Sequence, residues 1–307
     1  MATICITGGT GMVGTAFTSY LLSKGHSVII LSRKQQQSTQ TGLSYARWDV
    51  DAGTYDASAF EQTDFVVHLA GAGVAEKRWT TARKNEILRS RTESSALLVR
   101  ALQETNHNVQ AVISASAIGW YGPDRGIAFT EETPPATDFL GETCRLWEAG
   151  MEPVIQLGIR LVKLRIGIVL SNKGGAFTEF MKPLKFGIAA ILGSGDQMIS
   201  WIHIADLCRM FEFAMEHTEM KGAYNATAPQ PVSNKELTIQ LATTLRNRFY
   251  IPVPVPAFIL KLMLGEMSIE ILKSCTTSAE KISAAGFRFG YPTIQAALNE
   301  LCKSQPD

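Results

Sequence analysis

The chain has 307 residues, of which 46% are hydrophobic and 19% are charged, and its formal net charge is +1. This length supports one large domain, alone or with a smaller lobe, and a charge near zero argues against nucleic acid or an anionic membrane surface as the main partner. The five cysteines are scattered without a C-x-x-C pair, so we expect neither a disulfide framework nor a zinc site, and a reducing cytoplasmic location.

No secretory signal precedes the first predicted strand, and the apolar stretch at residues 257–264 is too short to span a bilayer. We therefore expect no membrane association.

A strand–turn–helix unit opens the chain. Residues 3–7 form an apolar β-type run, three glycines follow at three-residue spacing, and a helical pattern continues to residue 23. The N-terminus of such a helix presents free N–H groups and a partial positive charge. The glycines permit a tight turn, close approach of a pyrophosphate, and packing of helix on strand. We predict a dinucleotide site made by the turn residues Gly8, Thr10, Gly11, Met12, Val13 and Gly14.

The second predicted strand, residues 27–31, decides between NAD(H) and NADP(H). An NAD site usually places a carboxylate at the end of this strand, to bind the ribose 2′-hydroxyl. Here the strand ends in Ser32, Arg33 and Lys34, whose hydroxyl and cations suit a 2′-phosphate. The pattern favours NADP(H). The alternative is that Arg33 and Lys34 are ordinary solvated charges.

The next two strand ends also carry candidate cofactor contacts. Asp49 closes the third strand and can accept a hydrogen bond from the adenine amino group. Leu69 closes the fourth strand, at residues 65–69, and is followed by Ala70 and Gly71, which are small enough to let the backbone lie against a ribose. The alternative for Ala70 and Gly71 is a tight turn at the strand end.

Further strands are predicted at residues 109–114 and 161–170, and helices at residues 80–104 and 139–151. Alternating strands and helices of this length predict right-handed βαβ crossovers, hence an α/β fold with a Rossmann-type doubly wound parallel sheet.

The pattern changes after residue 230. A helix at residues 232–249, an extended Pro-rich segment and a last helix at residues 294–301 predict a small, mostly helical C-terminal lobe. We divide the chain into a dinucleotide-binding domain, residues 1–230, and this lobe, residues 231–307.

Several motifs together point to one family. They comprise Thr7-Gly8-x-x-Gly11-x-x-Gly14, Arg78-Trp79-Thr80 with Ser90-Arg91, Gly193-Ser194-Gly195, Ser200-Trp201-Ile202-His203 and the segment at residues 252–298. This set resembles the atypical extended short-chain dehydrogenases/reductases, an NAD(P)-binding epimerase-like branch that ends in a small domain of unknown function. The resemblance implies that Arg91 faces the cofactor and that Val169 closes over the nicotinamide. From the residues alone, Arg91 reads equally as a surface ion-pair partner and Val169 as a buried strand residue.

Active members of this superfamily use a serine, a tyrosine and a lysine four residues after the tyrosine. Ser116, which follows the fifth strand, is the predicted serine. Residues 138–145 contain no tyrosine or lysine, so neither the Phe139/Thr143 register nor the Leu140/Cys144 register supplies the pair. We predict Tyr121 as a substitute acid. The alternative for Tyr121 is an aromatic wall over the substrate.

Two other readings of the sequence concern histidines. His203 lies in an apolar run, where a hydrogen-bonded structural role is favoured over that of a general base. The five histidines are dispersed with no pair at ligand spacing, so we expect no metal site.

Two functions remain open. The first is an NADP(H)-dependent oxidoreductase or epimerase acting on a small hydroxyl or carbonyl compound, for example a nucleotide-linked sugar. The second is a regulatory protein that binds NADP(H) without turnover. The missing tyrosine–lysine pair favours the second, whereas Ser116 and the glycine-rich loop at residues 193–195 indicate a small-molecule pocket and favour the first. We expect a monomer or a homodimer.

Overall fold

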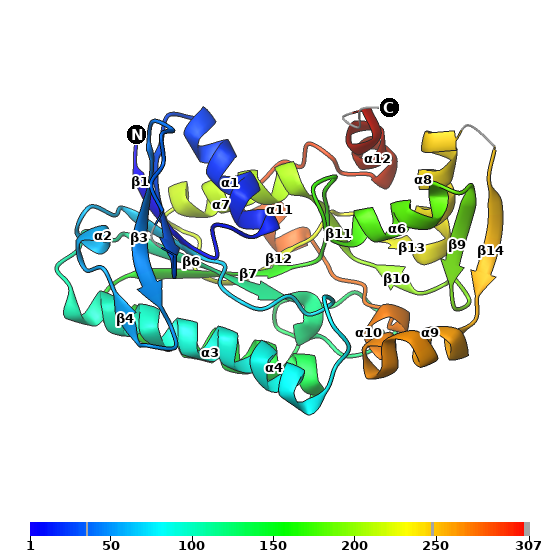
Figure 1. The fold of residues 1–307 in the computed structure, drawn as a ribbon, viewed down its shortest axis with the longest axis horizontal. Coiled ribbons are helices and arrows are strands. Elements are labelled where there is room, and N and C mark those ends of the chain that lie inside the picture. The colour runs from blue at the N-terminus through cyan, green and yellow to red at the C-terminus, as the bar shows by residue number, and fades with distance from the viewer. Residues whose placement is uncertain (35, 247–248, 304–307) are drawn as a thin grey trace.

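The computed structural model describes residues 1–34, 36–246 and 249–303. Its centre is an eight-stranded sheet with the order β12-β7-β6-β5-β1-β2-β3-β4 (Figure 1). Neighbouring strands are parallel throughout, except for the antiparallel pair β3–β4 at one edge. The strands are β1 (Thr3–Thr7), β2 (Ser27–Ser32), β3 (Leu43–Asp49), β4 (Thr54–Tyr55), β5 (Phe65–His68), β6 (Ala111–Ala117), β7 (Arg160–Ile166) and β12 (Gly222–Ala226).

Helices cover both faces of this sheet. On one face, apolar side chains of α1 (Met12–Ser23), α7 (Ile204–Glu216) and α11 (Glu280–Ala284) pack against alternate strand residues such as Ile4 and Ile30. On the other face, α2 (Ser58–Glu61), α3 (Thr81–Glu104), α4 (Phe139–Met151) and α5 (Pro153–Gln156) pack against the intervening residues, such as Cys5 and Ile29. Both faces of each central strand are therefore buried, and the predicted doubly wound sheet is confirmed.

A third apolar cluster forms a smaller lobe beside the sheet. It joins α6 (Ala176–Leu184) and β9 (Ile188–Leu192) to α8 (Asn234–Arg246) and α12 (Ile294–Lys303), and it includes Trp201. The strand β14 (Ile251–Val255) pairs in parallel with β9. The lobe thus takes residues from both sides of position 230, while Ile282 and Phe287 pack into the main core. The division at residue 230 stays a prediction.

The remaining elements connect these two bodies. They are η1 (Ile118–Trp120), β8 (Ile168–Leu170), β10 (Met198–Ile199), β11 (Trp201–His203), β13 (Val232–Ser233), α9 (Ala257–Leu264), η2 (Gly265–Met267) and α10 (Ser268–Leu272). None of the helices in the described ranges is long and apolar enough to cross a membrane.

Two predicted elements differ from the structure. The strand expected at residues 161–170 is broken at Gly167, where an added Cβ would lie 2.6 Å from the Ser200 carbonyl oxygen. The chain leaves the main sheet there, and β8 pairs with β11 instead. The helix expected at residues 232–249 begins only after β13, at Asn234, and residues 247–248 lie outside the described ranges.

Candidate cofactor and active site

In the glycine turn after β1, other protein atoms pack closely against Gly8 and Gly14, whereas the space beside Gly11 is open. Gly8 has φ +68°, and a Cβ there would lie 2.8 Å from the Leu69 carbonyl oxygen. A Cβ on Gly14 would lie 2.4 Å from the Gly8 carbonyl oxygen, so helix and turn touch at this point. A Cβ on Gly11 would meet only the Gly8 oxygen, at 3.4 Å.

Gly11 is also the N-cap of α1, and no side chain caps this helix. Thr10 and Gly11 are exposed, and Met12 and Val13 are half-buried. The first N–H groups of α1 therefore face an open cradle free of side chains, which is the arrangement that a pyrophosphate requires. The residues present fit a dinucleotide.

A buried hydrogen-bond chain fixes the loop after β5 against this turn. The Thr7 hydroxyl accepts from the backbone N–H groups of Leu69, at 3.1 Å, and Ala70, at 3.2 Å. It therefore donates its own proton to His68 Nδ1, at 2.8 Å, and Nε2 of His68 is left to donate to Ser95, at 3.2 Å. Burial lowers the pKa of His68 to about 4, so its ring is neutral near pH 7. These hydrogen bonds hold Leu69 and Ala70 beside Gly8.

The end of β2 carries unpaired cations. Arg33 and Lys34 are exposed, and within the described residues neither is ion-paired with a carboxylate. The Ser32 hydroxyl accepts from the Lys34 backbone N–H at 3.2 Å, which gives the segment a turn. Asp49, at the end of β3, already accepts from the Ala52 N–H at 3.0 Å through Oδ1.

One other predicted contact, Val169, lies in a segment that reaches the start of α1. Val169 of β8 is half-buried and pairs with Ile202 of β11. The glycines at 174 and 175, which follow it, lie against Met12: a Cβ on Gly175 would be 3.3 Å from the Met12 sulfur. The structure therefore brings the segment that begins at Val169 next to the N-terminus of α1.

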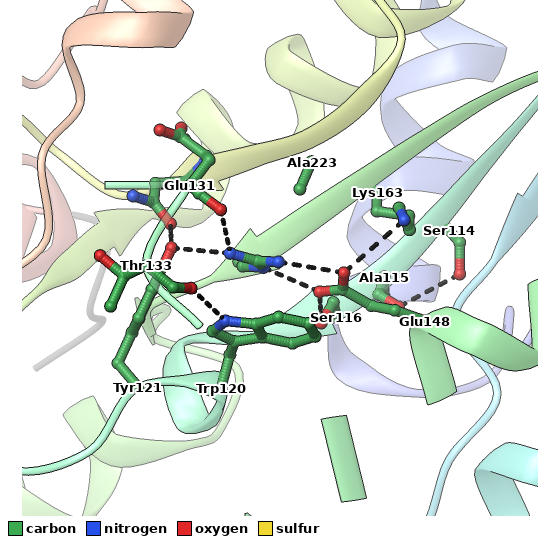
Figure 2. Close-up of polar contacts among 12 residues, drawn as sticks. Ser114, Ala115, Ser116, Trp120, Tyr121, Glu131, Thr133, Glu148, Lys163 and Ala223 are labelled. Atoms are coloured by element: carbon green, nitrogen blue, oxygen red, sulfur yellow. Dashed lines mark hydrogen bonds and ion pairs between the residues drawn. The ribbon is translucent and has the colours of Figure 1, made fainter. Parts of the chain in front are cut away.

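The predicted serine belongs to a buried ion network (Figure 2). Ser116 of β6 is 2% exposed, and its hydroxyl donates to Glu148 Oε1 at 2.7 Å. The Glu148 carboxylate, on α4, also accepts from Arg165 Nε at 2.8 Å and from Nη2 at 3.2 Å. The Arg165 guanidinium lies 3.7 Å from the centre of the Trp120 ring. Lys163 Nζ is 3.8 Å from Glu148 Oε2. Glu148 is thus the buried counter-charge of Arg165, while Lys163, at the edge of the network, also pairs with the exposed Glu152.

Tyr121 lies at the other end of the same network. Its side chain is fully buried, its hydroxyl donates to Asn225 Oδ1 at 2.7 Å, and it accepts from Arg165 Nη1 at 3.1 Å. Its ring stacks on Phe129, with the centroids 5.1 Å apart. Burial raises the pKa of Tyr121 to about 12. The phenol is therefore committed to protein partners, and the role of Tyr121 as the acid stays a prediction.

Glu148 was not singled out from the sequence as a functional residue. It belongs to the buried face of α4, together with Cys144, Trp147 and Met151. These positions recur with helical spacing, so a carboxylate among them indicates a buried charge that needs a partner. The sequence contained this signal, although it did not identify Arg165 as the partner.

The helix that should carry the tyrosine–lysine pair instead packs apolar side chains on η1. A Cβ on Gly119 would lie 3.2 Å from Leu140 Cβ and 3.5 Å from Cys144 Sγ. Phe139 packs edge-on against Trp79, with the ring centroids 5.1 Å apart.

His203 has the structural role that the sequence favoured. Its Nδ1 accepts from the Ala205 N–H at 3.1 Å, which caps α7, and its ring lies 3.9 Å from that of Tyr291. Over the described part of the chain, no group of three or more His, Cys, Asp or Glu side chains could hold a metal ion.

Comparisons with known proteins agree with this geometry. Residues 4–143 match the model of the NAD dependent epimerase/dehydratase family, and residues 255–301 match a domain of unknown function, DUF1731. Epimerase family protein YfhF of Bacillus subtilis is 35% identical over 299 residues, which are 97% of each chain. Epimerase family protein SH2119 of Staphylococcus haemolyticus is 35% identical over 303 residues, covering 98% of this chain and 99% of that one.

Solved structures give the same result. The human epimerase family protein SDR39U1, crystallised with NADPH, is 28% identical and superposes with a TM-score of 0.86, covering 99% of this chain and 100% of that one. A nucleoside-diphosphate sugar epimerase from Corynebacterium glutamicum is 32% identical with a TM-score of 0.77, covering 99% of this chain and 59% of that one.

Proposed function

The chain belongs to the NAD-dependent epimerase/dehydratase family, and on that premise we propose that it is an NADP(H)-dependent oxidoreductase or epimerase. Its substrate is a small carbonyl or hydroxyl compound. The observation that carries the choice of cofactor is the pair of exposed, unpaired cations, Arg33 and Lys34, at the end of β2 beside the open glycine turn. A 2′-phosphate supplies the anion that this cluster lacks.

Each predicted cofactor residue has a place in this proposal. The backbone of Thr10, Gly11, Met12 and Val13 holds the pyrophosphate, with Gly8 and Gly14 shaping the turn. Ser32, Arg33 and Lys34 bind the 2′-phosphate, and Asp49 uses its second carboxylate oxygen for the adenine. The loop at residues 69–71 supports the nicotinamide-side ribose, and Val169 lies over the nicotinamide. Arg91, which lies against Gly71 of this loop, faces the cofactor. The NADPH bound to human SDR39U1 supports NADP(H), although other proteins of this fold were solved with NAD.

NADPH, when bound, supplies a hydride. The chain itself offers fixed charges, but the hydroxyls of Ser116 and Tyr121 are both turned into the buried network. Proton exchange with a substrate oxygen therefore depends on water. Turnover is slow unless the substrate carries its own acid or base. A nucleotide-linked sugar stays among the proposed substrates, since the related Corynebacterium protein bears the name of a nucleoside-diphosphate sugar epimerase.

A second candidate is a protein that binds NADP(H) without turnover. One observation favours it: Ser116 and Tyr121 are 2% and 0% exposed, and both have protein partners for their hydroxyl groups. For either candidate we propose a reducing cytoplasmic location, because the five cysteines are all free thiols. We also propose that the protein is a monomer or a homodimer.

Calorimetry tests the cofactor assignment. We expect NADPH to bind at least ~10-fold more tightly than NADH, a difference of about 1.4 kcal/mol. Arg33→Ala should remove most of this preference. Lys24→Ala is the matched control, since Lys24 follows the other end of α1 and its removal changes the net charge equally. Equal affinities of the unmodified protein for NADPH and NADH would overturn the assignment.

Isotope transfer separates the two candidates. NADPH carrying deuterium at the reactive C4 position is incubated with the protein and a metabolite extract, and products are searched for deuterium by mass spectrometry. Deuterium in a product that the unmodified protein forms, and that a variant substituted at Gly11 does not form, supports the oxidoreductase. Tight NADPH binding with no transferred label, and no epimerised product when NADP⁺ replaces NADPH, supports the binding protein.

A further inference from the structure

Large apolar side chains gather on the outer surface of the small lobe. Thirteen large hydrophobic residues of the described ranges are exposed, and nine of them lie between residues 186 and 269, with exposed fractions from 37% to 84%. They come from the starts of β9 and β14, from these two paired strands, and from the contacting helices α9 and α10 that follow β14 (Figure 1). These nine residues are called the lobe surface: Phe186, Ile188, Phe249, Ile251, Val253, Phe258, Leu262, Met263 and Ile269.

The register of β14 on β9 gives this two-stranded sheet an apolar outward face. Ile251 pairs with Ile188, and Val253 pairs with Ala190. Ala189, between the two β9 residues, packs into the apolar cluster of the small lobe. Because side chains alternate between the two faces of a strand, the face that carries Ile188, Ile251 and Val253 turns away from that cluster. These three side chains are accordingly exposed.

The free edge of β14 is closed to a further strand. The Ile251 N–H donates to the Gly187 carbonyl oxygen, and the Val255 carbonyl oxygen accepts from the Gly193 N–H, so the backbone groups of these β14 residues face β9. The backbone of the alternate residues faces outward, and both of them, Pro252 and Pro254, lack an N–H. A partner therefore meets the side chains of the lobe surface and does not extend the sheet.

The lobe surface is larger than the apolar patch of an ordinary monomer. With about 180 Å² for a large apolar side chain, the exposed fractions of the nine residues correspond to roughly 1,000 Å². The largest apolar patch on a typical monomer covers about 300–600 Å². Each partner of a standard protein–protein interface buries about 800 Å². The lobe surface is therefore large enough for a stable interface.

The charge of this region indicates which partner fits it. Residues 186–192 contain no charged residue, and residues 249–264 contain one, Lys261. An anionic membrane or an acidic partner would be matched by several cations. A twofold axis instead brings a surface against itself, so a nearly uncharged surface meets its copy without repulsion. The exposed faces of α3 and α4 differ, since they carry the ion pairs Arg89–Glu93 and Glu142–Arg145.

We propose that a second copy of this chain docks on the lobe surface, so that the protein forms a homodimer through its small lobes. Both copies contribute the same residues, as is usual for a twofold interface. The centre of the interface is the apolar face of β9 and β14, which the two prolines keep from growing into a larger sheet. β14 and β1 lie toward opposite ends of the long axis of the molecule (Figure 1), so dimer formation does not require bound cofactor.

Sedimentation equilibrium of the full chain tests this proposal. We expect the unmodified protein to be a dimer at micromolar concentrations, with and without NADPH. Ile251→Glu and Leu262→Glu each place a carboxylate on the lobe surface of both copies, and each should raise the dissociation constant of the dimer at least ~100-fold. Both side chains are exposed in the single chain, so the variants should keep the circular dichroism spectrum of the unmodified protein. Ile127→Glu is the matched control, since Ile127 is 73% exposed and lies outside the lobe surface, and it should leave the dimer unchanged.

Three results would overturn the proposal. The first is an unmodified protein that is monomeric at these concentrations. The second is a dimer that persists in both Glu variants, because the two copies then meet on another face. The third comes from phosphatidylcholine vesicles: a monomer that sediments with them, when the Ile251→Glu variant does not, would assign the lobe surface to a membrane.

Discussion

Two polar regions of the molecule lie on neighbouring parts of the sheet and differ in how their charges are satisfied. In the cofactor region, comprising the glycine turn, residues 32–34 and Arg91, the cations have no carboxylate partners among the described residues. In the Ser116–Glu148–Arg165–Tyr121 network, each of these side chains bonds to another. Both regions contain residue types that can take part in catalysis or in ligand binding. Residue type alone therefore does not distinguish a binding site from a structural network.

The difference has an energetic reason. Burying a charge is costly unless a partner and hydrogen bonds offset the loss of water. The network meets this requirement internally, and it links β6, α4 and β7 through Ser116, Glu148 and Arg165. The cofactor region leaves its charges to be satisfied from outside. We infer that the network stabilises the fold and that the cofactor region binds the ligand.

The largest expected effect is on the network. Glu148→Gln leaves the buried Arg165 guanidinium without its counter-charge, so we expect a loss of about 3–5 kcal/mol in the free energy of unfolding. Urea denaturation measures this loss in the free energy of unfolding. Glu142→Gln, on the exposed face of the same helix, breaks the surface pair with Arg145 and should change stability little. Similar losses in the two variants would remove the distinction between a buried pair and a surface pair.

The next effect is on the cofactor region. Gly11→Val places a branched side chain where backbone meets pyrophosphate, so the affinity for NADPH should fall at least ~100-fold, about 2.7 kcal/mol. The fold should survive, because a Cβ at this position meets only one atom within 4 Å.

The Gly14→Val variant serves as a comparison for Gly11→Val. Its Cβ would lie 2.4 Å from the Gly8 oxygen, so the variant should lose stability as well as binding. Circular dichroism melts of both variants make the comparison. Undiminished NADPH binding by a folded Gly11→Val protein would show that the pyrophosphate lies elsewhere.

The smallest expected effect concerns Tyr121. Tyr121→Phe removes the bonds to Asn225 and Arg165 and should lower the free energy of unfolding by about 1–3 kcal/mol, with unchanged affinity for NADPH. Once a substrate is known, the turnover rate of the folded variant should also be unchanged. A rate loss of about 100-fold at full stability would instead restore Tyr121 as the catalytic acid.

Local patterns made much of this molecule predictable. The alternation of strands and helices along the chain, and with it the parallel sheet, depends on hydrophobic periodicity. The fingerprint from Thr7 to Gly14 depends on turn chemistry within a few residues. The strand at residues 161–170 was mispredicted because the approach of Ser200 to Gly167 is a long-range contact that apolar spacing does not record.

The site was less predictable for the same reason. Tyr121 and Ser116 are close in sequence, but the two residues that hold the Tyr121 hydroxyl, Asn225 and Arg165, come from distant segments. Arg91 and Arg165 are the same residue type in apolar surroundings, and only the tertiary structure shows that one has a carboxylate and the other does not.

A crystal structure of the protein with NADPH tests the central claim most directly. We predict that the pyrophosphate lies on the Gly11 backbone, that the 2′-phosphate contacts Arg33, and that Arg91 faces the cofactor. Tyr121 should keep its bonds to Asn225 and Arg165 and touch neither cofactor nor substrate. A 2′-phosphate directed away from Arg33, or a dinucleotide bound outside the glycine turn, would contradict the account.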